Sequence, residues 1–414
     1  MSWLPLALLL LAAALAGLLV AWRLRPAPPA PCQPQRYDVA PQPGTFAVRA
    51  LEAMPPIARE TPVLEAQSPA WREAMEQAGM RLRRARVRQV IFVHGTFVGH
   101  DPTQLLAALQ GPLSALGPGL MPSLQRLSKL PSDRVLGDLG NYTPEYVSLF
   151  QKALGAELPT TRFVWSSANN HVARLRAAVD LLRLLATSEL GRDRALLLGH
   201  SHGGQVLALL TQLVYPARTA EALWQAVRDA GEPADVLQDM ARKVARARLD
   251  IATFGMPPRY GWATGRQCRV LHVINHRGAE PRGSTVAGVL QTENGDYVHQ
   301  WGIAGSDLPP SNAKDRELAA RLDTILGEGY DVKAWLQHVR HGARVPRDGF
   351  SYLVDYGDRG TGVLPNCLAT CFGHGVYTSY DAMLFNARLL ADHFYREVGY
   401  LPSVRGKSSS RAAR

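Results

Sequence analysis

An apolar run that breaks abruptly into glycines and a serine constrains the fold of this chain more than any other feature. Residues 195–198 read ALLL and residues 199–204 read GHSHGG. A short, continuous apolar run of this kind is typical of a strand buried in a parallel sheet. Leucines and valines then recur at helical spacing over 206–214. Ser201 is therefore expected on a sharp turn from strand to helix, where glycines on either side leave its side chain room to project.

A serine in that place has a specific chemical use. A serine hydroxyl is a poor nucleophile unless a neighbouring base, itself oriented by a carboxylate, removes its proton. The first N–H groups of the helix, that of His202 among them, would lie beside the hydroxyl and stabilise an oxyanion. The pattern G-x-S-x-G occurs by chance in many proteins, but a strand before it and a helix after it make it a strong signal.

A second strand points to the same edge of the sheet. Residues 88–93 are apolar and β-branched, and they run directly into His94 and Gly95. The loop after such a strand would supply the other backbone N–H of an oxyanion hole, from Thr96 or Phe97. His94 is expected to pack within this loop.

The base is expected in the loop that follows the last strand, because the chain order in sheets of this kind is serine, acid, histidine. The last predicted strand is 350–356, and residues 373–375, which read GHG, lie beyond it. His374 is therefore the first candidate. Three competing histidines lie in or beside stretches with a helical pattern, namely His338, His341 and His393.

The acid that would orient His374 has several candidates. Asp307 is the first, because it follows a turn at the end of a strand-like run and stands between the serine and the histidine. Asp296 is assigned to a hairpin turn, from which 297–303 would return as a strand. Three further carboxylates near predicted strands remain alternatives: Glu280, Asp355 and Asp358.

Strands and helices alternate through the middle of the chain. Apolar strands are expected at 249–254 and 270–274, with helical patterns over 170–190, 219–230 and 233–247. This alternation predicts an α/β fold with a doubly wound, mostly parallel sheet. Broken amphipathic pieces over 103–130 would form helical inserts.

The N-terminus reads as a single membrane-spanning helix. Residues 3–22 are uncharged and long enough to cross a hydrocarbon core, and no Lys or Arg precedes them, which favours an anchor over a signal peptide. Arg23 and Arg25 favour a body on the cytoplasmic side. Four parts are thus predicted: an anchor (1–25), a proline-rich tether with a lead-in helix (26–84), the α/β domain (85–400) and a basic flexible tail (401–414).

Charge and cysteine content limit the partners. The net charge of +11 predicts attraction to anionic lipid headgroups. A nucleic-acid partner is not expected, because no recognised motif accompanies the charge. The four cysteines are too few for a disulfide scaffold. Cys367 and Cys371 lie close to His374, but a fourth ligand is missing, so a metal site is not expected.

Four segments together resemble the α/β-hydrolase superfamily, and within it the lipase-like serine esterases. They read IFVHGTF (91–97), GHSHGG (199–204), IATFGMP (251–257) and GHGVY (373–377). The resemblance implies hydrolysis of carboxylic esters, with lipid or other acyl esters leading, through an acyl-enzyme and without metal or organic cofactor. Ser201 would be the nucleophile and His374 the base. In one respect the chain departs from these lipases, which often carry an aspartate soon after the next strand, where HRGA (276–279) stands here.

Two other functions remain open beside ester hydrolysis. An acyl transferase or a thioesterase would use the same triad with a different acceptor or leaving group. A non-catalytic member of the fold would serve as a membrane-attached interaction module. The intact serine, histidine and glycines argue against the second of these.

Overall fold

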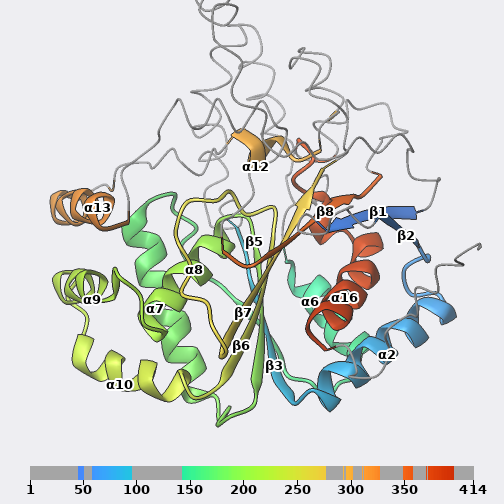
Figure 1. Cartoon of the computed structure of the whole chain (residues 1–414), viewed down its shortest axis with the longest axis horizontal. Coiled ribbons are helices and arrows are strands. Elements are labelled where there is room, and N and C mark those ends of the chain that lie inside the picture. Colours follow the sequence, from blue (N-terminus) through green and yellow to red (C-terminus); the bar gives the residue numbers. More distant parts are fainter. Residues whose placement is uncertain are drawn as a thin grey trace, which may run out of the picture. The chain divides into compact units, whose positions relative to one another are not determined.

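A single mixed sheet organises the molecule (Figure 1). The computed structural model describes residues 45–50, 58–95, 142–276, 292, 295–301, 310, 312–326, 348–357, 370 and 372–395. Within these ranges eight strands form one sheet in the order β2-β1-β8-β7-β6-β5-β3-β4. Their bounds are β1 Thr45–Ala50, β2 Ala58–Pro62, β3 Val87–Val93, β4 Thr160–Phe163, β5 Arg194–His200, β6 Arg248–Phe254, β7 Cys268–Asn275 and β8 Phe350–Asp355.

The six strands from β8 to β4 run parallel, while β1 and β2 are antiparallel at one edge. The predicted α/β fold with a mostly parallel sheet is therefore confirmed. Since the carboxyl ends of parallel strands meet at one edge of a sheet, the segments that follow β3, β5, β7 and β8 converge there. This edge carries the candidate site.

Helices cover both faces of the sheet (Figure 1). On one side lie α7 (His171–Thr187), α8 (His202–Val214), α9 (Ala220–Asp229), α10 (Ala234–Val244) and α13 (Ala313–Leu326). On the other side lie α2 (Pro69–Arg84), α6 (Pro144–Leu154) and α16 (Tyr380–Phe394). Two short helices, α12 (Tyr297–Trp301) and η2 (Val376–Thr378), lie near the carboxyl ends of the strands.

The central strands are apolar on both sides because both sides are covered. Ala195 and Leu197 of β5 pack in the core beneath α7 and α8, whereas Leu196 and Leu198 pack in the core beneath α2 and α16. Alternate side chains of a strand point to opposite faces, so a strand between two helical layers has no polar face. The ALLL run is the direct consequence.

Four helices begin where a polar side chain satisfies a free N–H. The oxygens of Ser68, Thr143, Asn170 and Ser379 accept from the backbone of α2, α6, α7 and α16, respectively. Such caps stabilise a helix by about 1 kcal/mol each. In α2 and α6 a proline follows the cap, a position where its missing N–H costs nothing.

Two segments have a structure that differs from the one expected from the sequence. The prediction that 297–303 returns as a strand is wrong, because Tyr297–Trp301 is helical and Oδ1 of Asp296 accepts from the His299 N–H at its start (2.8 Å). Residues 26–84, expected as a tether with a lead-in helix, contain β1, β2 and α2, and the two strands join the sheet.

The predicted membrane anchor, the inserts over 103–130 and the basic tail lie outside the described residues. No helix in the described ranges is long and apolar enough to cross a membrane.

Candidate active site

Ser201 occupies a strained turn between β5 and α8. Its φ of 52° and ψ of −129° are unusual for a residue with a side chain. Its N–H donates to the Phe254 carbonyl at the end of β6 (2.9 Å), and its carbonyl accepts from the Gly204 N–H (3.0 Å). Backbone in this conformation persists only where its surroundings hold it, and such residues cluster at functional sites. The expected strand–turn–helix is present.

The glycines two before and two after Ser201 are required by close packing. A Cβ at Gly199 would lie 2.8 Å from the Gly204 nitrogen, and a Cβ at Gly203 would collide with the Val93 carbonyl of β3. Both contacts are too short for any side chain. The turn therefore packs directly against β3.

His374 lies beside this turn. Its ring centroid is 4.7 Å from that of His200, and Nε2 of His200 is 3.1 Å from the His374 carbonyl. His374 follows β8 in the chain and is only 2% exposed. The histidine predicted from its place after the last strand is therefore packed against the residue that precedes Ser201.

The carboxylate partner of His374 is Asp296. Nδ1 of His374 lies 2.8 Å from Oδ2 of Asp296, and both side chains are buried. A carboxylate only accepts hydrogen bonds, so Nδ1 carries the hydrogen and Nε2 is left as the atom that can take a proton. Among the described residues, Asp296 is the one carboxylate within ion-pair distance of His374.

The acid proposed from the sequence was Asp307, with Asp296 assigned only to a turn. Asp307, Glu280 and Asp358 all lie outside the described residues. Asp355 ends β8 and its Oδ1 accepts from the Gly357 N–H (2.9 Å). The structure brings Asp296, rather than Asp355, to the histidine.

Asp296 reaches this place because the chain returns to the end of β7. Its N–H donates to the Asn275 carbonyl (3.0 Å), and the Asn275 side chain donates to the Gly373 carbonyl (2.9 Å). Gly295 has a φ of +90°, and a Cβ there would collide with the Asn275 carbonyl. Asp296 is thus adjacent in space to β7, where lipase-like chains often carry their acid, but far from it in sequence.

Gly255 of the TFGMP stretch leaves room for this carboxylate. Its φ is +60°, and a Cβ would lie 2.5 Å from Cε2 of Tyr377 and 2.7 Å from Oδ2 of Asp296. The hydroxyl of Tyr377 donates to that same Oδ2 (2.8 Å). The sequence pattern places Tyr377 in the GHGVY segment but does not predict its hydrogen bond to the acid.

Gly95 begins the expected oxyanion loop directly against the serine. A Cβ at Gly95 would lie 2.7 Å from the Ser201 Cβ and 3.3 Å from its Oγ. Thr96 and Phe97, the expected donors, lie outside the described residues. His202, the other expected donor, is the first residue of α8 and is buried.

His94 holds the start of this loop. Its Nδ1 donates to the Gly95 carbonyl (2.7 Å), and its Nε2 accepts from the Trp165 N–H (3.2 Å). The Trp165 indole in turn donates to the His94 carbonyl (2.9 Å). Burial lowers the pKa of His94 to about 4, so the ring is neutral at pH 7 and keeps this arrangement of donor and acceptor.

Ser201 and His374 each have one buried polar atom that forms no hydrogen bond within the described residues. In the described part of the chain, Oγ of Ser201 and Nε2 of His374 have no hydrogen-bond partner. Buried polar atoms are nearly always paired, and those that are not require an explanation. A proton passes between these two atom types when a serine is activated by a histidine.

The described residues contain no group of three His, Cys, Asp or Glu side chains placed to hold a metal ion, and Cys367 and Cys371 lie outside them. Comparisons of the chain with family models, with curated proteins and with solved structures found no match.

Proposed function

We propose that this protein is a serine hydrolase of the α/β-hydrolase type that cleaves carboxylic esters through an acyl-enzyme. The observation that carries the proposal is the buried His374–Asp296 pair, 2.8 Å between Nδ1 and Oδ2, beside a serine on a strained strand-to-helix turn. Nucleophile, base and orienting carboxylate are recognised by these roles.

In the acylation step, Oγ of Ser201 attacks the ester carbonyl carbon while Nε2 of His374 takes the hydroxyl proton. Asp296 stays ionised and stabilises the imidazolium that forms. The developing oxyanion would be held by the His202 N–H and by an N–H from the loop that starts at Gly95. When the carbon–oxygen bond to the alcohol breaks, His374 returns the proton to the leaving oxygen.

Deacylation repeats these steps with water. His374 takes a proton from the attacking water, the oxyanion forms again, and the acid is released as Ser201 regains its proton. No metal or organic cofactor is required by this sequence of steps.

Lipid or other acyl esters are the proposed substrates. The resemblance to lipase-like esterases supports this class, as does the apolar segment 3–22, which would hold the enzyme at a membrane with its body on the cytoplasmic side. An acyl transferase or thioesterase would share the site. Rates with an ester and with the matching thioester separate esterase from thioesterase activity, and product analysis with an alcohol acceptor present separates acyl transfer from hydrolysis.

Covalent labelling with a fluorophosphonate tests the proposal. Labelling is expected to disappear in Ser201→Ala and to fall sharply in His374→Ala, because the reagent reacts only with an activated serine. Ser166→Ala removes an exposed hydroxyl and is the matched control, with labelling unchanged. Circular dichroism checks that each variant is folded. Labelling that persists in folded Ser201→Ala would overturn the proposal.

A further inference from the structure

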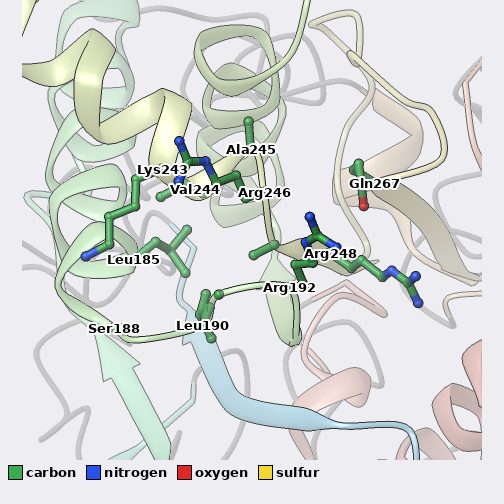
Figure 2. Close-up of a pocket in the computed structure, with 12 residues that line it drawn as sticks. Leu185, Ser188, Leu190, Arg192, Lys243, Val244, Ala245, Arg246, Arg248 and Gln267 are labelled. Carbon is green, nitrogen blue, oxygen red and sulfur yellow. The ribbon is translucent and has the colours of Figure 1, made fainter.

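A pocket of about 800 Å³ opens at the end of the sheet opposite Ser201 (Figure 2). It is lined by the loop between α7 and β5, by the segment from the end of α10 to the start of β6, and by Gln267. Strand β5 runs from this end to the serine over seven residues, which corresponds to about 20 Å. The pocket is therefore distinct from the candidate active site.

The charged side chains in the lining are all cationic. Arg192, Lys243, Arg246 and Arg248 contribute to it, and no Asp or Glu does. Figure 2 shows Lys243 and Arg246 on one side of the pocket and Arg192 and Arg248 on the other. The Arg248 N–H donates to the carbonyl of Asp193, the residue after Arg192 (2.9 Å). Arg192 therefore lies just before β5, and Arg248 begins the neighbouring strand β6.

Two buried carboxylates close to these arginines in the sequence do not neutralise them. Asp193 and Asp250 are buried, and each already binds two arginines that do not line the pocket. These pairs are Arg86 and Arg88 with Asp193, both at 2.6 Å, and Arg269 and Arg194 with Asp250, at 2.7 and 3.2 Å. Within the described ranges, Arg192, Arg246 and Arg248 make no ion pair or side-chain hydrogen bond.

Attraction to a helix end accounts for the position of only one of the four cationic side chains. Helices α7 and α10 both finish at this pocket, and the C-terminal end of a helix attracts positive charge. Lys243 serves that purpose, because its Nζ donates to the Ala186 carbonyl in the last turn of α7 (2.6 Å). The three arginines lie beyond the helix ends and bind no carbonyl there. All three arginines are exposed to solvent, and an anion bound between them would relieve the repulsion among their charges.

We propose that this pocket binds an anion that carries a phosphate group. Several arginines around one cavity favour a multiply charged anion, and the guanidinium fork matches the oxygens of a phosphate. The volume is within the range of sites for small organic ligands. A free phosphorylated molecule and a phospholipid headgroup share this chemistry, and the inference does not depend on the proposed esterase activity.

Calorimetric titration of the full chain with inorganic pyrophosphate tests the site. Pyrophosphate is expected to bind saturably at one site per chain, and Arg246→Gln/Arg248→Gln is expected to raise its Kd about tenfold or more, because charged hydrogen bonds are lost. Arg72→Gln/Arg218→Gln is the matched control. It removes the same charge from exposed residues away from the pocket and is expected to change the Kd by less than about twofold. Ester hydrolysis should be unchanged in both variants.

A vesicle experiment distinguishes the two sources of phosphate. Binding to phosphatidylcholine vesicles is compared with binding to vesicles that also contain phosphatidic acid. Insertion of the N-terminal segment contributes to binding in both cases and cancels in the difference. If the protein binds the acidic vesicles more strongly and pyrophosphate removes this extra binding, the ligand is a phospholipid headgroup. If pyrophosphate binds but the acidic vesicles give no extra binding, the ligand is a soluble phosphorylated molecule. Absence of saturable pyrophosphate binding by the wild type, or equal weakening in the control variant, would overturn the proposal.

Discussion

The carboxylate of Asp296 accepts three hydrogen bonds from three different residues. His374 and the hydroxyl of Tyr377 donate to Oδ2, and the His299 N–H donates to Oδ1, each at 2.8 Å. Tyr377 also accepts from the Asn275 N–H (2.7 Å). Burial raises the pKa of Tyr377, so its hydroxyl stays protonated and keeps donating to the acid. Tyr377 therefore links the Asp296 carboxylate to Asn275 at the end of β7.

Replacement of the acid tests its assignment directly. In Asp296→Asn the orientation and tautomer of His374 are no longer enforced, and kcat/KM for an ester is expected to fall by about 10³–10⁴-fold. Asp355→Asn is the matched control, since its side chain can still accept from the Gly357 N–H and its activity should remain near wild type. A larger loss in Asp355→Asn than in Asp296→Asn would contradict the assignment.

Tyr377 is expected to act through Asp296 as a positioning residue. Tyr377→Phe removes one donor to the acid, so kcat should fall by about tenfold and the free energy of unfolding by about 1–3 kcal/mol. The decisive measurement is the double variant with Asp296→Asn, in which Tyr377→Phe should have no further effect on kcat. Tyr356→Phe, which loses a buried hydroxyl bonded to Asn386 (2.8 Å), should lower stability alone. Additive losses in the double variant would rule out this role.

At the scale of elements, the strands buried on both faces were predictable and those at the edge were not. The expected strands 249–254 and 350–356 match β6 and β8 within one residue, because each is a largely apolar stretch that is followed by a glycine. β1 and β2 lie at the antiparallel edge within a proline-rich stretch, where packing imposes a weaker pattern. Tyr297–Trp301 has strand-like residues, yet Asp296 at its start favours a helix.

The site residues differ in the same way between local and long-range patterns. Ser201 is predictable from a local pattern, with glycines two residues before and two after it at the end of a strand. His374 is predictable from its place beyond the last strand, between two glycines. Asp296 is also preceded by a glycine, but its partner Asn275 lies across an excursion that no local pattern spans. Only the return of the chain to β7 brings it to His374.

The turn after β6 offers a test at this scale. Gly255→Ala is expected to lower the free energy of unfolding by about 1–3 kcal/mol and to reduce activity, because the methyl group would displace Tyr377 and Asp296. Gly261→Ala is the matched control, since a Cβ there meets nothing within 4 Å. Urea unfolding and ester hydrolysis measure the two effects, and equal stability of the two variants would contradict the packing argument.

At the scale of the whole molecule, buried neutral histidines link stability to pH. Burial lowers the pKa of both His94 and His272 to about 4. The side chain of His272 lies between the Thr253 hydroxyl (2.7 Å) and the Asp348 carbonyl (2.9 Å). Between pH 6.5 and 4 the unfolded chain binds protons at these positions and the folded chain does not, so acid favours unfolding.

The size of this effect can be measured at His272. From pH 7 to pH 5 the free energy of unfolding should fall, with each of the two histidines contributing about 2 kcal/mol. In His272→Gln the fall should be smaller by about that amount, as measured by urea unfolding at the two pH values. An undiminished pH dependence in the variant would show that His272 does not supply it.

The anchoring of Asp296 has a consequence for how this protein could evolve. The chain leaves β7 at Asn275 and is tied back to that same residue at Asp296, so both ends of the intervening stretch are secured at one point. Loop-closure cost rises slowly with length, so sequence can be added or removed between them at little cost. Natural or laboratory selection could therefore change the length of this stretch while the contact between Asp296 and His374 is inherited unchanged.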